Sequence, residues 1–406
     1  MPGSTPSREK WLVAVAFVAP LASLYAAKGL IWLVLGLALS LIWMERKEQP
    51  QFPGFPKGFA IFLVGVLAWG AASIIWSIAP DRTLGKGIDL FAVLSGILVL
   101  FSVHRRLDSG GQKAVGMALA MGIGIACLIV LGERVSDGFL IKQVRNPVGL
   151  STEELFSNFN RGLAVMAVLL WPALMALENQ GRRLLAIGLA GLVLVTLWSL
   201  YGMAFSLALT LGVIAFVLSA VTPRPMTKLL GGIAAIWVMM APIAMDRVLT
   251  HIDPASMVSD HSNVSVVHRL YIWKFATEKI MERPLLGHGL GAARAVPGGQ
   301  DLVALTLEDV PAKGTLISLH THNGPLQLWL ELGFPGAALG AVGIFLLFSL
   351  AAKMNYAIAR GLMVAQISTA FVIYNLSFGI WQAWWLVVLA LGAFYMALFT
   401  DDAARA

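Results

Sequence analysis

The chain has 406 residues, of which 58% are hydrophobic and 13% are charged. Because so few charged residues cannot cover a water-facing surface, the composition excludes an ordinary soluble protein. It predicts an all-α integral membrane protein in which residues 1–406 form a single polytopic domain. The net charge is +7, but the cations stand between hydrophobic segments rather than along one stripe, which argues against a nucleic-acid-binding protein. The single cysteine, Cys127, excludes a disulfide within the chain.

Apolar segments long enough to cross about 30 Å of hydrocarbon recur from Trp11 to Phe399. Most Lys and Arg residues of the short gaps fall on one side, whereas the short gaps opposite hold only Lys28, Arg82 and Lys86. The positive-inside rule therefore predicts that both termini lie in the cytoplasm. We expect about twelve transmembrane helices, near residues 11–27, 29–44, 59–77, 88–103, 114–132, 162–178, 184–200, 202–221, 229–245, 324–350, 358–378 and 381–399.

Two long gaps fall on the outer side of this topology. Residues 133–161 are expected to form a shorter periplasmic loop, and residues 246–323 a large one. The positive-inside rule exempts long loops, so their cations do not contradict the orientation. Within the large loop, apolar residues of segment 266–281 recur at helical spacing beside Lys and Arg, which predicts an amphipathic helix at the membrane surface. The Pro and Gly residues of segment 284–291 then predict a tight turn.

Two histidines, His320 and His322, stand directly before the predicted helix at 324–350. A histidine has a reference pKa of about 6.5, and a helix N-terminus favours its neutral form, which can accept a proton. Both histidines could instead simply satisfy hydrogen bonds of the loop. A zinc site would need a third and usually a fourth ligand, and no Cys or further His-rich cluster is near in sequence.

Five arginines fall in the two long gaps, and the planar fork of arginine suits phosphate oxygens. Arg161 is the most informative of them, because it begins an uninterrupted apolar helix where an unpaired cation would be costly. Any one of them could instead reach lipid headgroups or pair with Glu153, Glu154 or Glu278. The five are Arg145, Arg161, Arg269, Arg283 and Arg294.

The predicted spans contain few ionisable residues, Asp89 being an exception. Transporters commonly carry charged relays and broken helices in paired positions within their spans. Neither is clear in this sequence, whereas cations gather on the outer face, so we favour an enzyme over a transporter. The transporter remains the alternative from another class.

Two strings of residues resemble the O-antigen ligase and polymerase superfamily. The first is His320-x-His322-Asn323-x-x-Leu326 followed by Glu331-x-Gly333-x-x-Gly336. The second is Arg269-x-x-x-Trp273, then Glu282-x-Pro284-Leu285-Leu286-Gly287-x-Gly289-Leu290-Gly291, which is similar to the large periplasmic loop of that family. The order of about twelve spans with one long loop before the histidines matches as well, and the resemblance implies a GT-C-like glycosyltransferase architecture.

The resemblance implies an O-antigen ligase that transfers a glycan from undecaprenyl diphosphate to a sugar of lipid A-core. It further implies inverting transfer without metal or cofactor, in the bacterial inner membrane with a periplasmic active site. The expected partners are undecaprenyl diphosphate-linked O-antigen, lipid A-core oligosaccharide and membrane lipids, with no nucleic acid. The alternative within the superfamily is an O-antigen or exopolysaccharide polymerase, whose acceptor is a second lipid-linked glycan.

The resemblance also implies roles for particular residues. His322 matches the essential histidine of the family, and we expect it to be the general base for the acceptor hydroxyl. Arg161 and Arg269 are expected to hold the donor diphosphate, and Arg145 is assigned to the same group. His320 is expected to support the base or the acceptor. Asn323 is expected to cap the following helix or to orient the base.

Overall fold

The computed structural model describes residues 6–44, 57–102, 107–145, 152–200, 202–258, 264–307 and 312–403. These residues form helices and one two-stranded sheet, with short 3-10 helices labelled η. The elements are α1 Pro6–Ala26, η1 Ala27–Gly29, α2 Leu30–Met44, α3 Lys57–Ala72, η2 Ser73–Ile75, α4 Pro80–Ser102, α5 Ser109–Val135, α6 Phe139–Arg145, α7 Thr152–Ser157, α8 Asn160–Asn179, α9 Arg183–Ser199, α10 Met203–Val221, α11 Arg224–Thr250, η4 Pro254–Met257, α12 Val264–Glu282, η5 Ala293–Ala295, β1 Leu302–Ala304, β2 Lys313–Thr315, α13 Gly324–Ala351, α14 Ala357–Leu376 and α15 Ala383–Ala403.

Ten helical segments of the described residues are long and apolar enough to cross a membrane. The first, Arg8–Leu41, runs through α1, η1 and α2, where the sequence predicts two spans, and α9 is apolar but shorter. The predicted all-α, multi-pass membrane protein is therefore confirmed. All twelve predicted spans fall on helices, and the number of crossings stays a prediction.

Helix α8 lies at the centre of the largest hydrophobic core. Its residues 162–173 are buried without interruption, which is the pattern of a helix covered on every side. It packs against α1, α5, α9, α14 and α15. The first turn of α8 carries Arg161, so dense packing on the rest of the helix fixes where this cation emerges.

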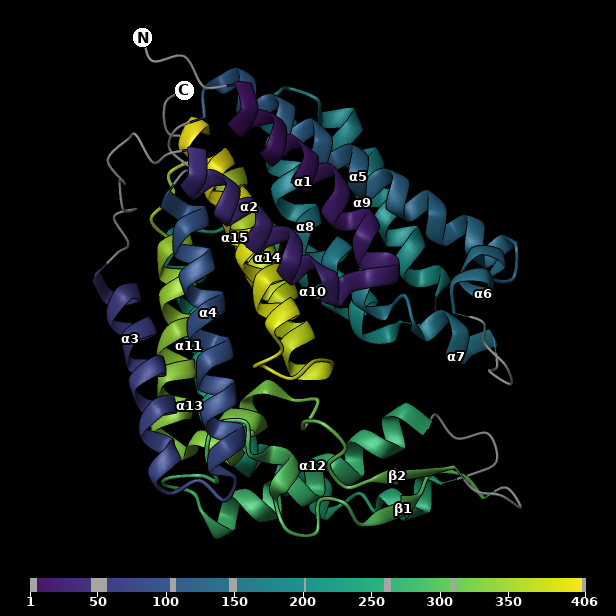
Figure 1. Ribbon diagram of the computed structural model, residues 1–406, viewed down its shortest axis with the longest axis vertical. Coiled ribbons are helices and arrows are strands. Elements are labelled where there is room, and N and C mark those ends of the chain that lie inside the picture. Colours follow the sequence, from purple (N-terminus) through teal and green to yellow (C-terminus); the bar gives the residue numbers. More distant parts are fainter. Residues whose placement is uncertain are drawn as a thin grey trace.

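A second group of helices, α3, α4, α11 and α13, packs beside this core (Figure 1). Helix α14 connects the two groups, since it contacts α8 and α10 on one side and α13 on the other. The turn between α14 and α15, residues 377–382, therefore lies where the two groups meet. We call these six residues the 377–382 loop.

A layer made of α12 and the β1–β2 hairpin covers one end of the helices, opposite the end where both termini lie (Figure 1). The strands are antiparallel, with Leu302 opposite Thr315. The predicted helix at 266–281 is confirmed as α12, whose buried side contacts α11 and α13. Its position at a membrane surface stays a prediction.

Both predicted long loops contain short elements of their own among the described residues. Segment 133–161 holds the short helices α6 and α7, and segment 246–323 holds α12 and the hairpin, although α11 continues into it as far as Thr250. That both segments are periplasmic stays a prediction.

Helix α13 is broken at Gly333, which has φ 63° and ψ −160°. The break frees backbone carbonyls that the helix would otherwise bond. Leu330 O accepts from His288 N at 2.9 Å and Glu331 O accepts from Gly289 N at 2.8 Å. Leu332 O accepts from Trp69 Nε1 at 2.9 Å. Irregular backbone at membrane depth is tolerated when protein groups satisfy it in this way.

Candidate active site

The loop before α13 is held from both sides. Trp273 of α12 donates its Nε1–H to Thr321 O at 3.0 Å, and Thr321 Oγ1 donates to Asn323 O at 2.6 Å. Asn323 Oδ1 accepts from Leu326 N at 3.0 Å, so Asn323 caps α13 as the sequence suggests. The histidine loop is therefore fixed against both the outer layer and the membrane helix.

His322 has a backbone φ of 53°, in the left-handed region that side-chain-bearing residues rarely adopt. Its Nδ1 lies 2.6 Å from the backbone carbonyl oxygen of Ser377 in the 377–382 loop. A carbonyl oxygen only accepts, so Nδ1 carries the proton and donates it. In the neutral ring Nε2 then keeps a lone pair, which is the atom that a general base needs.

His320 lies directly beside His322 and is 5% exposed. The ring centroids are 4.1 Å apart, and His320 Nδ1 accepts from the backbone N–H of His322 at 3.3 Å. On its other side His320 packs so closely against Gly379 that a Cβ there would overlap the ring. The 377–382 loop therefore supports both histidines.

The surroundings keep both imidazoles neutral. Burial lowers the pKa of His322 to about 3, and electrostatic interactions with His320 and Arg269 act in the same direction, although the Ser377 hydrogen bond acts in the opposite direction. Burial also lowers the pKa of His320 to about 4. The positive charge of Arg269 in α12 helps to lower the pKa of both histidines, so this side chain lies near both rings. Burial also lowers the pKa of Arg269 itself.

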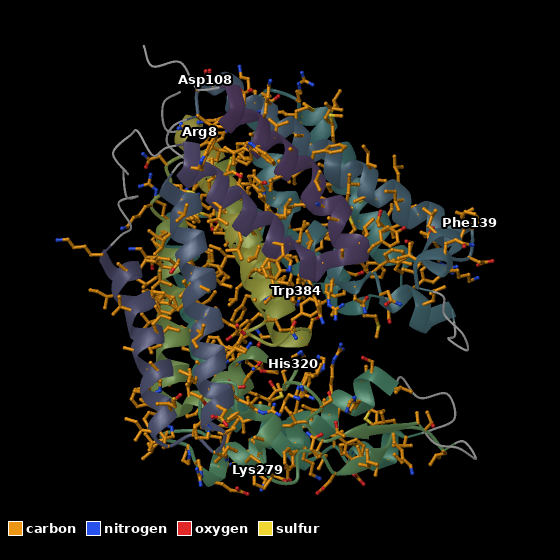
Figure 2. The ribbon with its side chains drawn as sticks, in the orientation of Figure 1. Arg8, Asp108, Phe139, Lys279, His320 and Trp384 are labelled. Atoms are coloured by element: carbon orange, nitrogen blue, oxygen red, sulfur yellow. The ribbon has the colours of Figure 1, made fainter. Side chains whose placement is uncertain are left out.

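Arg161 approaches the same loop from α8. Its guanidinium carbon lies 6.0 Å from the ring centroid of Trp384, in the first turn of α15 just beyond the 377–382 loop. Trp384 packs on Phe378, the neighbour of Ser377, with ring centroids 4.7 Å apart. In the view of Figure 2, Trp384 and His320 both lie toward the outer layer. The structure thus brings together His320, His322, Arg161 and Arg269 of the predicted residues.

Arg145 is the last residue of α6, and its side chain lies outside the described part of the structure. Sequence reasoning missed Ser377 and Trp384, which hold His322 and Arg161 respectively. No sequence signal identifies Ser377, because it acts through its backbone oxygen. Tryptophan is common at the membrane interface, so the sequence around Trp384 does not distinguish it as a site residue.

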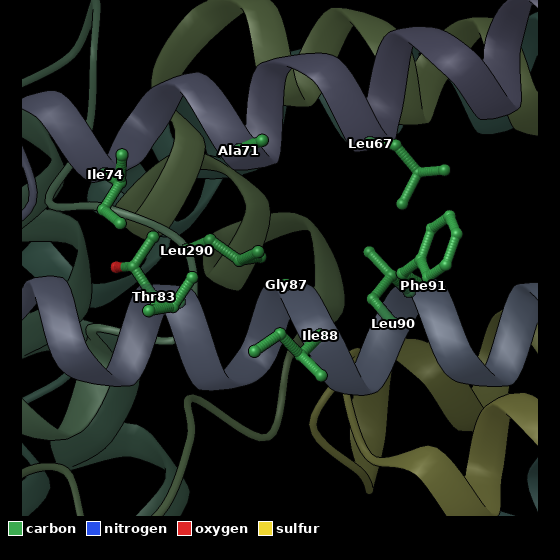
Figure 3. Close-up of a pocket in the computed structure, with 10 residues that line it drawn as sticks. Leu67, Ala71, Ile74, Thr83, Gly87, Ile88, Leu90, Phe91 and Leu290 are labelled. Atoms are coloured by element: carbon green, nitrogen blue, oxygen red, sulfur yellow. The ribbon is translucent and has the colours of Figure 1, made fainter.

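A separate cavity of about 470 Å³ lies between α3 and α4 (Figure 3). Its lining is apolar apart from Thr83, and Leu290 forms part of its wall. None of the candidate catalytic or diphosphate-binding residues lines it. The cavity is therefore distinct from the histidine site.

Comparison with known proteins finds a family match for part of the chain. Residues 155–341 match the family model described as O-Antigen ligase. A Rickettsia felis protein named "Putative polysaccharide ligase" is 27% identical over 79% of this chain and 75% of its own. A Rickettsia typhi protein with the same description is 25% identical over 89% of both chains.

The segment that matches the O-antigen ligase family contains four of the predicted site residues and runs from before α8 into α13. Those residues are His320, His322, Arg161 and Arg269. The 377–382 loop and Trp384 lie beyond residues 155–341, so helices outside the matched segment complete the site. The family resemblance predicted from the sequence is confirmed, and the chain is a membrane enzyme acting on polysaccharide.

Proposed function

We propose that this protein is an O-antigen ligase that transfers a glycan from undecaprenyl diphosphate to a sugar of lipid A-core. The observation that carries the proposal is the hydrogen bond from His322 Nδ1 to the Ser377 carbonyl oxygen, because it leaves Nε2 of a neutral ring as proton acceptor. The family match and the ligase names of the relatives favour a ligase over a polymerase. The arginines that gather in the two long segments likewise favour an enzyme over a transporter.

In the proposed reaction His322 Nε2 accepts the proton of the acceptor hydroxyl. The hydroxyl oxygen attacks the anomeric carbon of the donor sugar from the face opposite the diphosphate, so configuration inverts. One glycosidic C–O bond forms, the C–O bond to the diphosphate breaks, and undecaprenyl diphosphate leaves with the electron pair. The leaving group is already a stabilised anion, so no second carboxylate is needed to protonate it.

The arginines are proposed to bind that anion. Arg269 is partly buried beside the histidines, where a diphosphate would compensate its charge. Arg161, held over Trp384, would approach the same diphosphate from α8. Arg145 is proposed as a further contact from α6, and His320 as the residue that supports the backbone of His322.

The proposal also implies on which side of the membrane the reaction takes place. The site lies at the end of the helices opposite both termini, which supports a periplasmic active site in the inner membrane with cytoplasmic termini. A lipid-linked donor and a lipid-linked acceptor would then both reach the site at the membrane face.

The test is a transfer assay with purified protein, undecaprenyl diphosphate-linked glycan and lipid A-core, with and without EDTA. Glycan should appear on lipid A-core irrespective of EDTA. His322→Ala should lower the rate by roughly 10²- to 10⁴-fold while the protein remains folded in detergent. Longer carrier-linked chains would instead identify a polymerase, loss with EDTA would overturn the metal-independent mechanism, and transfer to neither acceptor would contradict an enzyme of this class.

A further inference from the structure

A buried carboxylate in α13 connects three segments around the site. Glu331 is 1% exposed. Its Oε2 accepts from Trp381 Nε1 at 2.7 Å and from Gly291 N at 2.5 Å, and its Oε1 accepts from Gln327 Nε2 at 3.0 Å. A buried carboxylate is tolerated when donors surround it in this way, and each such charge-assisted bond is stronger than a neutral one.

Gln327 lies one helical turn before Glu331 on the same face of α13. Its Nε2 donates to Glu331, and its Oε1 accepts from the backbone N–H of Ile380 at 3.1 Å. The two side chains therefore bind two successive residues of the 377–382 loop, Ile380 through its backbone and Trp381 through its indole. We call this pair the α13 clamp.

The clamped loop is the segment that orients the histidines. Ser377, three residues before Ile380, supplies the carbonyl that accepts from His322 Nδ1 at 2.6 Å. Gly379, directly before Ile380, packs against the His320 ring. A shift of the loop would therefore move the acceptor of the His322 proton, and with it the choice of which ring nitrogen is protonated.

We propose that Glu331 is a positioning residue for the transfer reaction. Together with Gln327 it holds the 377–382 loop so that Ser377 keeps the proton of His322 on Nδ1 and leaves Nε2 free for the acceptor hydroxyl. The kinetic consequence rests on the function proposed above, whereas the loop attachment can be measured without it.

An exchange of the two clamp residues separates positioning from direct chemistry. In Glu331→Gln two amides face each other; if Gln327 rotates to pair with the new amide, it loses the Ile380 bond. Gln327→Glu places two carboxylates together. In the double variant the new carboxylate at 327 can accept from Ile380 and from the new amide at 331. The carbonyl of that amide can accept from Trp381 and Gly291, so every bond has a partner again.

The matched control is Thr369→Val in α14. Thr369 is fully buried, and its Oγ1 accepts from Trp171 Nε1 at 2.9 Å. The control therefore changes the side chain that accepts from a tryptophan N–H, as Glu331→Gln does, but about 12 Å along α14 from Ser377. Trp381→Phe is a milder clamp variant, because it removes the N–H while keeping an aromatic ring.

The variants are compared by hydrogen exchange of the peptide covering residues 377–382, read by mass spectrometry, and by kcat and KM in the transfer assay. Glu331→Gln and Trp381→Phe should speed exchange in this peptide and lower kcat roughly 10- to 100-fold with little change in KM. The double variant should restore both, and Thr369→Val should alter neither.

Two results would overturn the proposal. Unchanged exchange in both Glu331→Gln and Trp381→Phe would show that the clamp does not hold the loop. Restored exchange without restored kcat in the double variant would show that the reaction needs a carboxylate at position 331 itself. A wild-type protein that transfers no glycan would overturn the proposed function instead, and the exchange data would still decide whether the clamp exists.

Discussion

The chemistry open to His322 depends on which groups surround its ring. Its Nδ1 faces a backbone carbonyl rather than a carboxylate, so its hydrogen-bond partner brings no negative charge that would stabilise the protonated ring. His320, His268 and Arg269 all oppose its protonation electrostatically. The residue is therefore held as a neutral acceptor over a wide pH range.

The acid limb of the activity profile tests this interpretation. Burial depresses the pKa of His322 to about 3, so the neutral form persists as pH falls through the ordinary histidine value of about 6.5. We expect kcat/KM to be nearly constant from about pH 8 to about pH 5 and to decline only at lower pH. The residual activity of His322→Ala serves as the baseline. A decline centred near pH 6.5 in the wild type would mean that the ring is solvated in the free enzyme.

Arg269→Lys tests how the donor diphosphate is held. A charge-assisted contact contributes about 1.5–3 kcal/mol, so Arg269→Ala should raise the apparent KM for the donor roughly tenfold or more. Lysine keeps the charge but lacks the planar fork, so Arg269→Lys should recover little of the affinity. Lys274→Ala, at an exposed position on the same helix, is the control. Donor affinity that is unchanged in both Arg269 variants would remove the arginine from the diphosphate site.

Among the elements, α12 and α13 show what local sequence can and cannot predict. Apolar periodicity predicts α12, and the asparagine before an apolar segment predicts the cap at Asn323. Local sequence does not predict the break at Gly333, because glycine and proline are both tolerated in continuous membrane helices, and Pro335 is therefore no signal. The break depends on partners far away in sequence, His288, Gly289 and Trp69, which donate hydrogen bonds to the freed carbonyl oxygens.

Gly333→Ala should disrupt this element. An alanine at φ 63° and ψ −160°, a region that essentially only glycine adopts, costs roughly 1–3 kcal/mol, and its methyl would also overlap the Leu285 carbonyl. We expect a lower thermal midpoint in detergent, followed by tryptophan fluorescence, together with lost transfer. The control is Gly232→Ala in α11, where a Cβ meets open space. A thermal midpoint for Gly333→Ala equal to that of the control would show that α13 is not strained at this point.

At the scale of the whole molecule, composition and hydropathy are enough to predict a multi-pass helical protein. The motifs likewise predict that His322 and Arg269 belong to one site. They cannot predict the contribution of the α14–α15 turn, because Ser377 acts through its backbone and Trp384 through long-range packing. Such contacts depend on how the two helix groups meet, which no local pattern encodes.

The orientation across the membrane can be checked by cysteine labelling. Cys127, the single native cysteine, is buried, so background labelling should be low. In spheroplasts a membrane-impermeant maleimide should label Glu278→Cys, on the exposed side of α12, and should not label Lys113→Cys near the start of α5. Permeabilised cells should label both. The reverse pattern in intact spheroplasts would place the histidine site in the cytoplasm.

The pairing of His322 with a peptide carbonyl also bears on the timing of the reaction. A ring whose pKa is near 3 takes up a proton readily only from a hydroxyl that has already become acidic, which happens when its oxygen is partly bonded to an electron-poor carbon. In the proposed reaction, the sugar would therefore acquire substantial oxocarbenium character before the proton moves. Selectivity among acceptors would then depend mainly on how a hydroxyl is aimed at that carbon, and only weakly on how acidic it is.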